Sequence, residues 1–115
     1  MENQEKNEFI SFVCDTLDDA KKLFMRKNEQ YATQGDPLAN FRTGALLRYR
    51  CDDIKYLYET AKDYEGKHIA QVYDNGIDGD KVDESLKDII IYSAIELYMI
   101  KCNKRQDEKA GTGNE

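Results

Sequence analysis

The residues best suited to chemistry in this chain are two carboxylates near its end, Glu84 and Asp88. On a helix, residues four positions apart lie one turn above each other on the same side. Burying unpaired carboxylates is costly, and a hard divalent cation with oxygen ligands is a standard way to offset that cost. The pair therefore indicates either a metal or substrate site, or a helix N-terminus whose dipole favours acidic residues. The second interpretation explains Glu84 well and Asp88 less well.

The helix that must position these carboxylates is apolar on two sides. One face is formed by Val82, Leu86, Ile89, Ile90, Ser93, Leu97 and Ile100. The opposite side carries Glu84 and Asp88 on the same line as Ile91 and Ile95. Because a helix with two apolar sides is usually covered on both, we expect it to be buried on two sides. The two carboxylates should then face a cleft shared with Lys67 or His68.

The rest of the chain also has helical spacing, which predicts an all-α fold, a helical bundle of about four helices. Apolar residues recur at three and four positions in residues 5–31, and a short helical segment should contain Leu46 and Leu47. Residues 52–74 should form one long helix, or two helices with a break near Gly66. No segment alternates between apolar and polar residues for long enough to indicate a sheet.

Turn residues divide these helices and set the domain limits. Residues 32–41 hold clustered turn residues, including Asp36-Pro37, which is typical of a turn or a helix start. Residues 75–80, NGIDGD, are a clear turn before the last helix. We expect one helical domain over residues 1–104. Residues 105–115 are almost entirely polar or glycine, which predicts a disordered tail.

The composition excludes several classes of function. The chain has 115 residues, 17 Lys and Arg against 23 Asp and Glu, and a net charge of −6. That balance disfavours direct binding to nucleic acid or to an anionic membrane. Cys14, Cys51 and Cys102 are widely spaced and odd in number, as expected of reduced thiols in a cytoplasmic protein. We find no signal peptide and no apolar run long enough to span a bilayer.

Several short segments together resemble a group of small bacteriophage and prophage proteins. That group is related to the nucleotide-modification-associated and MazG-like all-α nucleotide pyrophosphatases. The resemblance rests on KNEQYATQGDPLANFR, EGKHIAQVYDNG and KVDESLKDIIIYSAI. Its matched positions are Lys27, Asn28 and Tyr31; Asn40 and Phe41; Lys67, His68 and Asp74; and Glu84, Asp88 and Tyr92.

The resemblance implies a nucleotide-binding protein or a Mg²⁺-dependent nucleoside triphosphate pyrophosphohydrolase in the cytoplasm of a bacterial host. Glu84 and Asp88 would hold the magnesium ion. Lys67 and His68 would be the catalytic residues, one neutralising phosphate charge and the other orienting or protonating a leaving oxygen. Substrate would also be bound by Lys27, Asn40 and Tyr92. Relatives of this kind assemble as homo-oligomers, so we expect a homodimer.

The alternative is a non-catalytic phage accessory or anti-defence protein that acts by binding a host protein. It rests on a departure from the pattern: MazG-like enzymes carry Glu-x-x-Glu on the helix before the last, and residues 44–75 contain no such pair. Glu59 and Asp63 have a different spacing, and a solvated pair beside Lys62 explains them equally well. A lone histidine such as His68 is also more often a packed or surface residue than a catalytic one.

Overall fold

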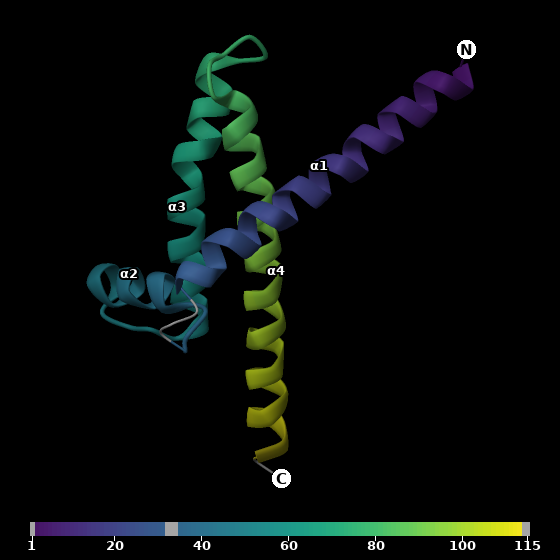
Figure 1. The fold of residues 1–115 in the computed structure, drawn as a ribbon. Helices are drawn as coiled ribbons and strands as arrows, with labels where there is room; N and C mark the ends of the chain where they lie inside the picture. The colour runs from purple at the N-terminus through teal and green to yellow at the C-terminus, as the bar shows by residue number, and fades with distance from the viewer. Residues whose placement is uncertain (1, 32–34, 114–115) are drawn as a thin grey trace.

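Four helices make up the fold, which is seen in a computed structural model that describes residues 2–31 and 35–113, with side chains for 3–29 and 35–109. The helices are α1 (Glu2–Tyr31), α2 (Ala39–Tyr49), α3 (Ile54–Asn75) and α4 (Val82–Gly113) (Figure 1). No strand occurs within the described ranges. The predicted all-α class with about four helices is confirmed. None of these helices, as far as described, is both long and apolar enough to cross a membrane.

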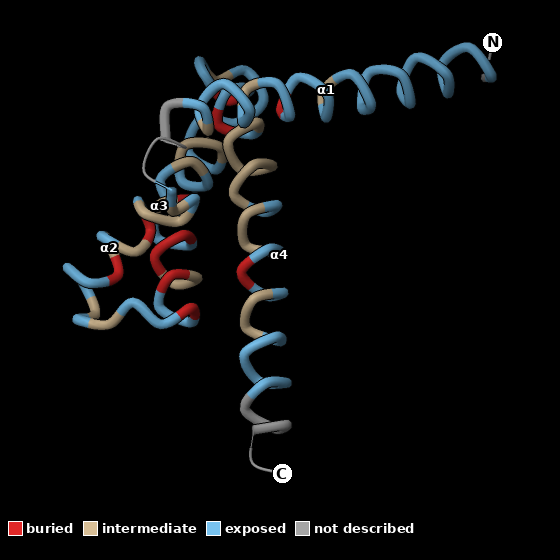
Figure 2. The backbone as a smooth tube through the Cα atoms, turned by 60° about the horizontal axis from the view of Figure 1, so that its bottom comes forward, coloured by how far each residue is buried: buried red, intermediate tan, exposed pale blue. Residues whose placement is uncertain are grey.

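The core lies where α3 packs against α2 and α4. Its buried side chains are Phe41, Ala45, Ile54, Leu57, Ala61 and Met99, and Figure 2 shows the buried positions concentrated on α2, α3 and the middle of α4. Gly44 lets α2 approach α3 closely, because a Cβ atom there would collide with the Tyr64 hydroxyl and the Thr60 side chain. This contact places α2 across the start of α3.

Asp36 and Pro37 lie in the turn that leads into α2, where the sequence predicts a turn or a helix start. The backbone N–H of Leu38 donates to Asp36 Oδ1 at 3.0 Å, and the N–H of Ala39 donates to the Asp36 carbonyl at 3.2 Å. Arg42 Nε donates to Asp36 Oδ2 at 2.8 Å. The bond from Arg42, and less strongly the one from the Leu38 N–H, lower the pKa of the Asp36 carboxyl. Asp36 is thus an ionised, fixed residue between α1 and α2. Residues 32–34 of the predicted turn lie outside the described ranges.

A tight turn joins α3 to α4 and keeps them side by side (Figure 1). Gly76 adopts a positive φ of 68° and its N–H donates to the Val72 carbonyl at 3.1 Å. Gln71 Nε2 then donates to the Asp80 carbonyl across the turn at 3.2 Å. The predicted turn over residues 75–80 is confirmed. By contrast, α3 passes through Gly66 without a break.

The first helix crosses α4 and continues beyond it, so that its first half projects from the molecule in both Figure 1 and Figure 2. Phe9 and Phe12 on this projecting part are 69% and 72% exposed. The molecule measures 61 × 32 × 28 Å with a radius of gyration of 17.8 Å. A compact chain of this length has a radius of gyration of about 13 Å. The fold is therefore elongated.

The faces of α4 differ from the prediction. Leu86, Leu97 and Ile100, from the predicted apolar face, are 47%, 66% and 39% exposed. Val82 is buried as that face predicts, but the other buried side chains described on this helix are Ser85 and Met99, which lie outside the predicted face. The prediction of burial on two sides is wrong for most of the helix. The reason is that α3 runs along only one side of α4, and α1 covers the other side only where it crosses.

The last helix also runs further than the sequence predicts. It continues to Gly113, through nine residues that we expected to be a disordered tail. Extending an existing helix avoids the cost of nucleation, and KRQDEK consists of residues compatible with a helix. Residues 104–109 are all exposed, so this part of the extension is not held by packing. Residues 114–115 lie outside the described ranges, and a domain limit at residue 104 stays a prediction.

Candidate functional site

A polar cavity of about 380 Å³ opens where all four helices come close together. Six of the seven site residues predicted from the sequence line it: Lys27 from α1, Asn40 from α2, Lys67 and His68 from α3, and Asp88 and Tyr92 from α4. Its volume is at the lower end of the range for small-molecule sites, roughly 300–1,000 Å³. The fold therefore gathers residues that are up to 65 positions apart into one cavity large enough for a small ligand.

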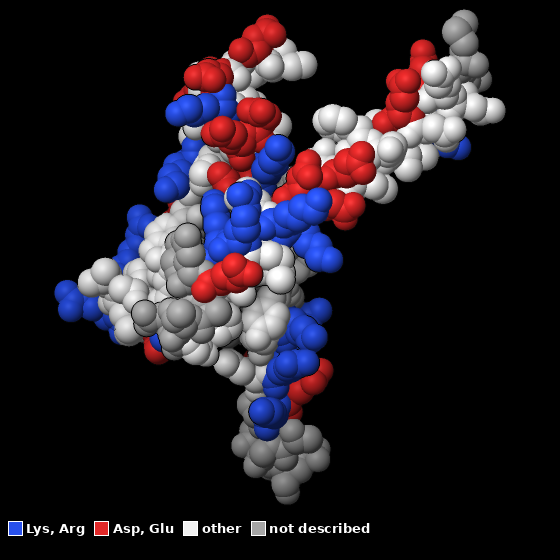
Figure 3. All heavy atoms as spheres, in the orientation of Figure 1, with Lys and Arg blue, Asp and Glu red and all other residues white. Residues whose placement is uncertain are grey.

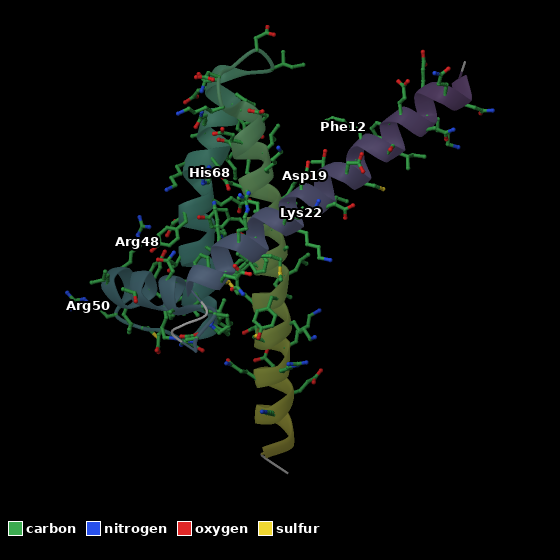
Figure 4. The ribbon with its side chains drawn as sticks, viewed as in Figure 1. Phe12, Asp19, Lys22, Arg48, Arg50 and His68 are labelled. Atoms are coloured by element: carbon green, nitrogen blue, oxygen red, sulfur yellow. The ribbon has the colours of Figure 1, made fainter. Side chains whose placement is uncertain are left out.

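Helical geometry explains how each element supplies its residues. Asp88 and Tyr92 are one turn apart on α4 and lie on the side that also presents Ile91 and Ile95 to the cavity. His68 is on α3, and Figure 4 shows it between α3 and α4. Lys27 comes from the last turns of α1, which is the part that has already crossed α4. The crossing of α1 over α4 thus brings Lys27 to the site.

Asp88 is the centre of the charged contacts in this cavity. Its Oδ1 lies 3.5 Å from Lys27 Nζ, and its Oδ2 lies 3.5 Å from His68 Nδ1. The side chains of Asp88 and His68 are only 23% and 20% exposed, whereas Lys27 is 55% exposed. Both distances exceed those of short charge-assisted hydrogen bonds. These are long ion-pair distances, which a bound ligand can rearrange at little cost.

Three further polar groups of the cavity, on Lys67, Asn28 and Asn40, can meet a ligand. Lys67 makes no ion pair with any residue that the structure describes. The side-chain amides of Asn28 and Asn40 line the cavity without a hydrogen bond to another described side chain or backbone group. The second carboxylate, Asp36, is already held by Arg42. Since both carboxylates are compensated and Lys67 is not, the cavity favours an anionic ligand.

Aromatic rings form the apolar wall of the same cavity. Phe41 and Tyr92 meet edge to face with ring centroids 6.4 Å apart, and the His68 ring lies 5.7 Å from that of Tyr92. Phe24 of α1 adds a third aromatic side chain. Flat aromatic surfaces beside amide groups suit a planar heterocycle, which stacks on the rings and exchanges hydrogen bonds with the amides.

Glu84, the seventh predicted residue, does not line the cavity. It is exposed on the turn of α4 that precedes Asp88, and its backbone N–H donates a hydrogen bond to Asp83 Oδ1. Among the described residues, no group of three or more His, Cys, Asp or Glu side chains is placed to hold a metal ion. The cavity itself offers Asp88 and the arginine-bound Asp36. The residues present therefore do not form a ready magnesium site, and a magnesium role for Glu84 and Asp88 stays a prediction.

Two other positions of the motif set lie in the cavity, although the sequence assigned them no role. Asn28 and Phe41 both line it, and their place beside Lys27 and Asn40 in the matched segments was the available signal. Asp74 is exposed near the end of α3 and does not line the cavity. The side chain of Tyr31 lies outside the described ones.

Glu59 and Asp63 are engaged elsewhere. Glu59 pairs with Lys62 at 3.2 Å, as the solvated interpretation predicts. Asp63 accepts a hydrogen bond from Arg48 Nη1 at 2.7 Å and another from the Tyr49 hydroxyl at 2.9 Å. Neither carboxylate lines the polar cavity. Asp63 thus stabilises the contact between α2 and α3, whereas Glu59 pairs within α3. The pair does not replace the absent Glu-x-x-Glu.

Comparison with known proteins assigns the chain to no family, since no family model, curated protein or solved structure matches it. The resemblance drawn from the short segments stays a prediction. What the chain does must be argued from the cavity itself.

Proposed function

We propose that this protein binds a nucleotide in the polar cavity between its four helices. The observation that carries the proposal is the convergence of lysines, free amides and aromatic rings on one space of about 380 Å³. A nucleotide is a small ligand that presents both multiple negative charges and a planar base. Each of these parts has a matching set of side chains in the cavity.

The phosphates belong on the side of Lys67 and Lys27. Lys67 offers an ammonium group without a partner among the described residues, and Lys27 can exchange its 3.5 Å contact with Asp88 for a phosphate oxygen. An ammonium group suits phosphate as a compact charge with three donors. The base then lies against Phe41 and Tyr92, where Asn40 can exchange hydrogen bonds with its edge.

Hydrolysis of a bound nucleoside triphosphate is the further step that His68 and Asp88 could support. A carboxylate 3.5 Å from an imidazole can orient the ring. A water molecule would attack the phosphorus and form a new P–O bond while the bond to the leaving phosphate oxygen breaks. The ring would give a proton to that leaving oxygen and regain one from the attacking water, while Lys67 neutralises the charge that develops on the leaving oxygen. Because the cavity does not supply a ready magnesium site, a requirement for Mg²⁺ is a separate proposal that has to be measured.

The test is a thermal-shift scan against nucleoside triphosphates, nucleoside monophosphates, nucleosides and inorganic triphosphate, each with and without Mg²⁺. A ligand that binds only the folded state stabilises it by about 2.7 kcal/mol at a hundredfold excess over Kd. We expect nucleoside triphosphates to raise the melting temperature more than nucleosides or inorganic triphosphate do. If no member of the panel shifts the transition, the proposal fails.

The second candidate is the non-catalytic phage accessory protein that binds a host protein. The observation that favours it is the projecting part of α1, where large apolar side chains such as Phe9 and Phe12 are exposed (Figure 2). This candidate predicts a monomer that shows no nucleotide-dependent shift. The same apolar surface has another explanation within the chain itself.

A further inference from the structure

The isolated chain exposes much more surface than a compact protein of its size. Its accessible surface is 9048 Å², whereas a folded monomer of 13.4 kDa exposes about 6,500 Å². The difference is roughly 2,500 Å². Large homodimer interfaces cover about 1,000–2,500 Å² of each chain. The excess is therefore of the size that a permanent dimer would bury.

The surplus includes an apolar stripe on α1 that is only half covered. Phe9, Val13, Leu17, Ala20 and Phe24 follow one another at intervals of four, four, three and four residues, so they lie along one side of the helix. Ala20 is 4% exposed where α1 crosses α4, but Phe9, Val13 and Leu17 are 69%, 39% and 51% exposed. A single stripe thus continues from a packed contact into solvent.

A receiving surface of the same chemistry lies beside the covered half. An apolar cavity of about 540 Å³ opens between α1 and α4, with Ala20, Phe24, Ile90, Ala94 and Tyr98 among its lining residues. It is large enough to accept aromatic and aliphatic side chains. The exposed half of α1 and this cavity are therefore complementary in character, and both are present on every copy of the chain.

The charges along α1 select a second copy in the antiparallel orientation. Residues 2–19 contain six acidic residues and one lysine, a net charge of −5, whereas residues 20–31 contain four basic residues and one glutamate, a net charge of +3. Figure 3 shows acidic side chains along the projecting part and basic side chains where α1 crosses α4. Antiparallel pairing places each acidic half on a basic half, while parallel pairing would place like charges together.

We propose that two copies form a two-fold dimer in which their α1 helices pair antiparallel. Phe9 and Val13 of each copy would cover the apolar cavity between α1 and α4 of the other, opposite Phe24 and Ala20. This cavity and the polar one share Phe24, Asn28 and Phe41. The second copy thereby closes the apolar side of the candidate site. The dimer does not depend on the nucleotide proposal, and its test uses no nucleotide.

Light scattering on the wild-type chain and two matched variants tests the interface. Val13→Glu puts a carboxylate into the stripe, and Ser11→Glu puts the same charge on the other side of α1, two residues away. Since a two-fold dimer would bury two such charges, we expect Val13→Glu to weaken dimerisation by at least about 100-fold. Ser11→Glu should dimerise as the wild type does. A monomeric wild type, or a Val13→Glu dimer as tight as the wild type, would overturn the proposal.

Cysteine cross-linking tests the orientation. In a background without Cys14, Cys51 and Cys102, the variant Thr16→Cys places its two thiols close to the proposed two-fold axis, and Phe9→Cys places them at opposite ends of the interface. Under mild oxidation we expect a disulfide-linked dimer for Thr16→Cys and none for Phe9→Cys. Efficient cross-linking at both positions would indicate parallel helices, and no cross-link at position 16 would place the interface elsewhere. Either result overturns the antiparallel arrangement.

Discussion

At the scale of single residues, Glu84 and Asp88 show that two carboxylates one helical turn apart can have very different surroundings. Asp88 lies between Lys27 and His68 in the cavity, while Glu84 is exposed outside it. Their spacing predicts a common side of the helix correctly. Whether that side is covered depends on where α1 crosses α4. The spacing of residues along α4 carries no information about the position of that crossing. The two residues therefore make a matched pair for mutation.

We predict that Asp88→Asn changes nucleotide binding and that Glu84→Gln does not. Without Asp88, Lys27 and His68 lose their competing anion, so a nucleoside triphosphate in EDTA should bind about tenfold more tightly. Stability should change by less than about 1 kcal/mol, because the Lys27 pair is half exposed. If Mg²⁺ enters the site with the phosphates through Asp88, any effect of Mg²⁺ on nucleotide affinity should also disappear in Asp88→Asn. Calorimetric titration of both variants in EDTA and in Mg²⁺ measures this, and weaker binding by Asp88→Asn in EDTA would contradict it.

Glu96 should make the protein less stable at alkaline pH. Burial, then a hydrogen bond and charge repulsion with the buried Glu65, raises the pKa of Glu96 to about 7 from an ordinary 4.5, while Lys62 acts in the opposite direction. Its Oε2 is buried without a hydrogen-bond partner among the described residues. A raised pKa in the folded state contributes stability that is complete below about pH 4.5 and is lost as the pH rises through 7.

The measurement is the free energy of unfolding at about pH 5.5 and about pH 8.5 for the wild type and Glu96→Gln. The wild type should lose stability over this range, and the variant should lose much less because its amide cannot ionise. A wild-type stability that is constant across the range, or an equal loss in the variant, would show that Glu96 does not titrate in this way.

At the scale of elements, replacing two helical glycines by alanine should have opposite effects on stability. Gly44 faces the Tyr64 hydroxyl and Thr60 across the contact between α2 and α3, whereas a Cβ atom at Gly66 would meet nothing within 4 Å. We expect Gly44→Ala to destabilise the fold by about 1–3 kcal/mol. Gly66→Ala should stabilise it by about 0.5–1 kcal/mol, since alanine loses less backbone entropy in a helix. Urea unfolding of both variants checks the pair, and equal effects would contradict the packing of α2 on α3.

The helices themselves were predictable because their signals are local. Apolar spacing predicted residues 5–31 as a helix, and α1 spans Glu2–Tyr31. Asp36-Pro37 and the NGIDGD segment predicted the turns that precede α2 and α4. Hydrogen bonds between residues close in the sequence now explain where both helices start. Gly66 did not break α3, because a single glycine in a helix costs about 1 kcal/mol. The packing of the helix segments before and after Gly66 outweighs that cost.

Which face of each helix is buried was less predictable, because that depends on the neighbouring helix that packs against it. The apolar stripe with Leu86 and Leu97 looked like a core face and is largely exposed. Met99 and Ser85 pack instead, since α3 lies on their side of α4. For the site, the order of short motifs identified six cavity-lining residues, but Asn28, Phe41 and Asp36 were given no role. Only the packing of all four helices shows that they line the same cavity.

At the scale of the whole molecule, the elongated shape and the cavity have a common cause. Because α1 crosses α4 instead of lying along it, its last turns reach the cavity with Lys27 and Asn28 while its first half projects into solvent. The same crossing thus brings candidate ligand-binding residues to the cavity and leaves the apolar stripe of α1 exposed. If the dimer forms, ligand binding and assembly share one helix.

In the proposed complex, the nucleotide lies in the polar cavity with its phosphates at Lys67. The most direct measurement is a calorimetric titration of a nucleoside triphosphate into the wild type, Lys67→Ala and Lys55→Ala. Both lysines are exposed on α3, but only Lys67 lines the cavity. We predict a dissociation constant at least about tenfold higher for Lys67→Ala, as expected for the loss of one charge-assisted bond. Lys55→Ala should bind as the wild type does. Equal affinities for all three proteins, or no binding by the wild type, would contradict the claim.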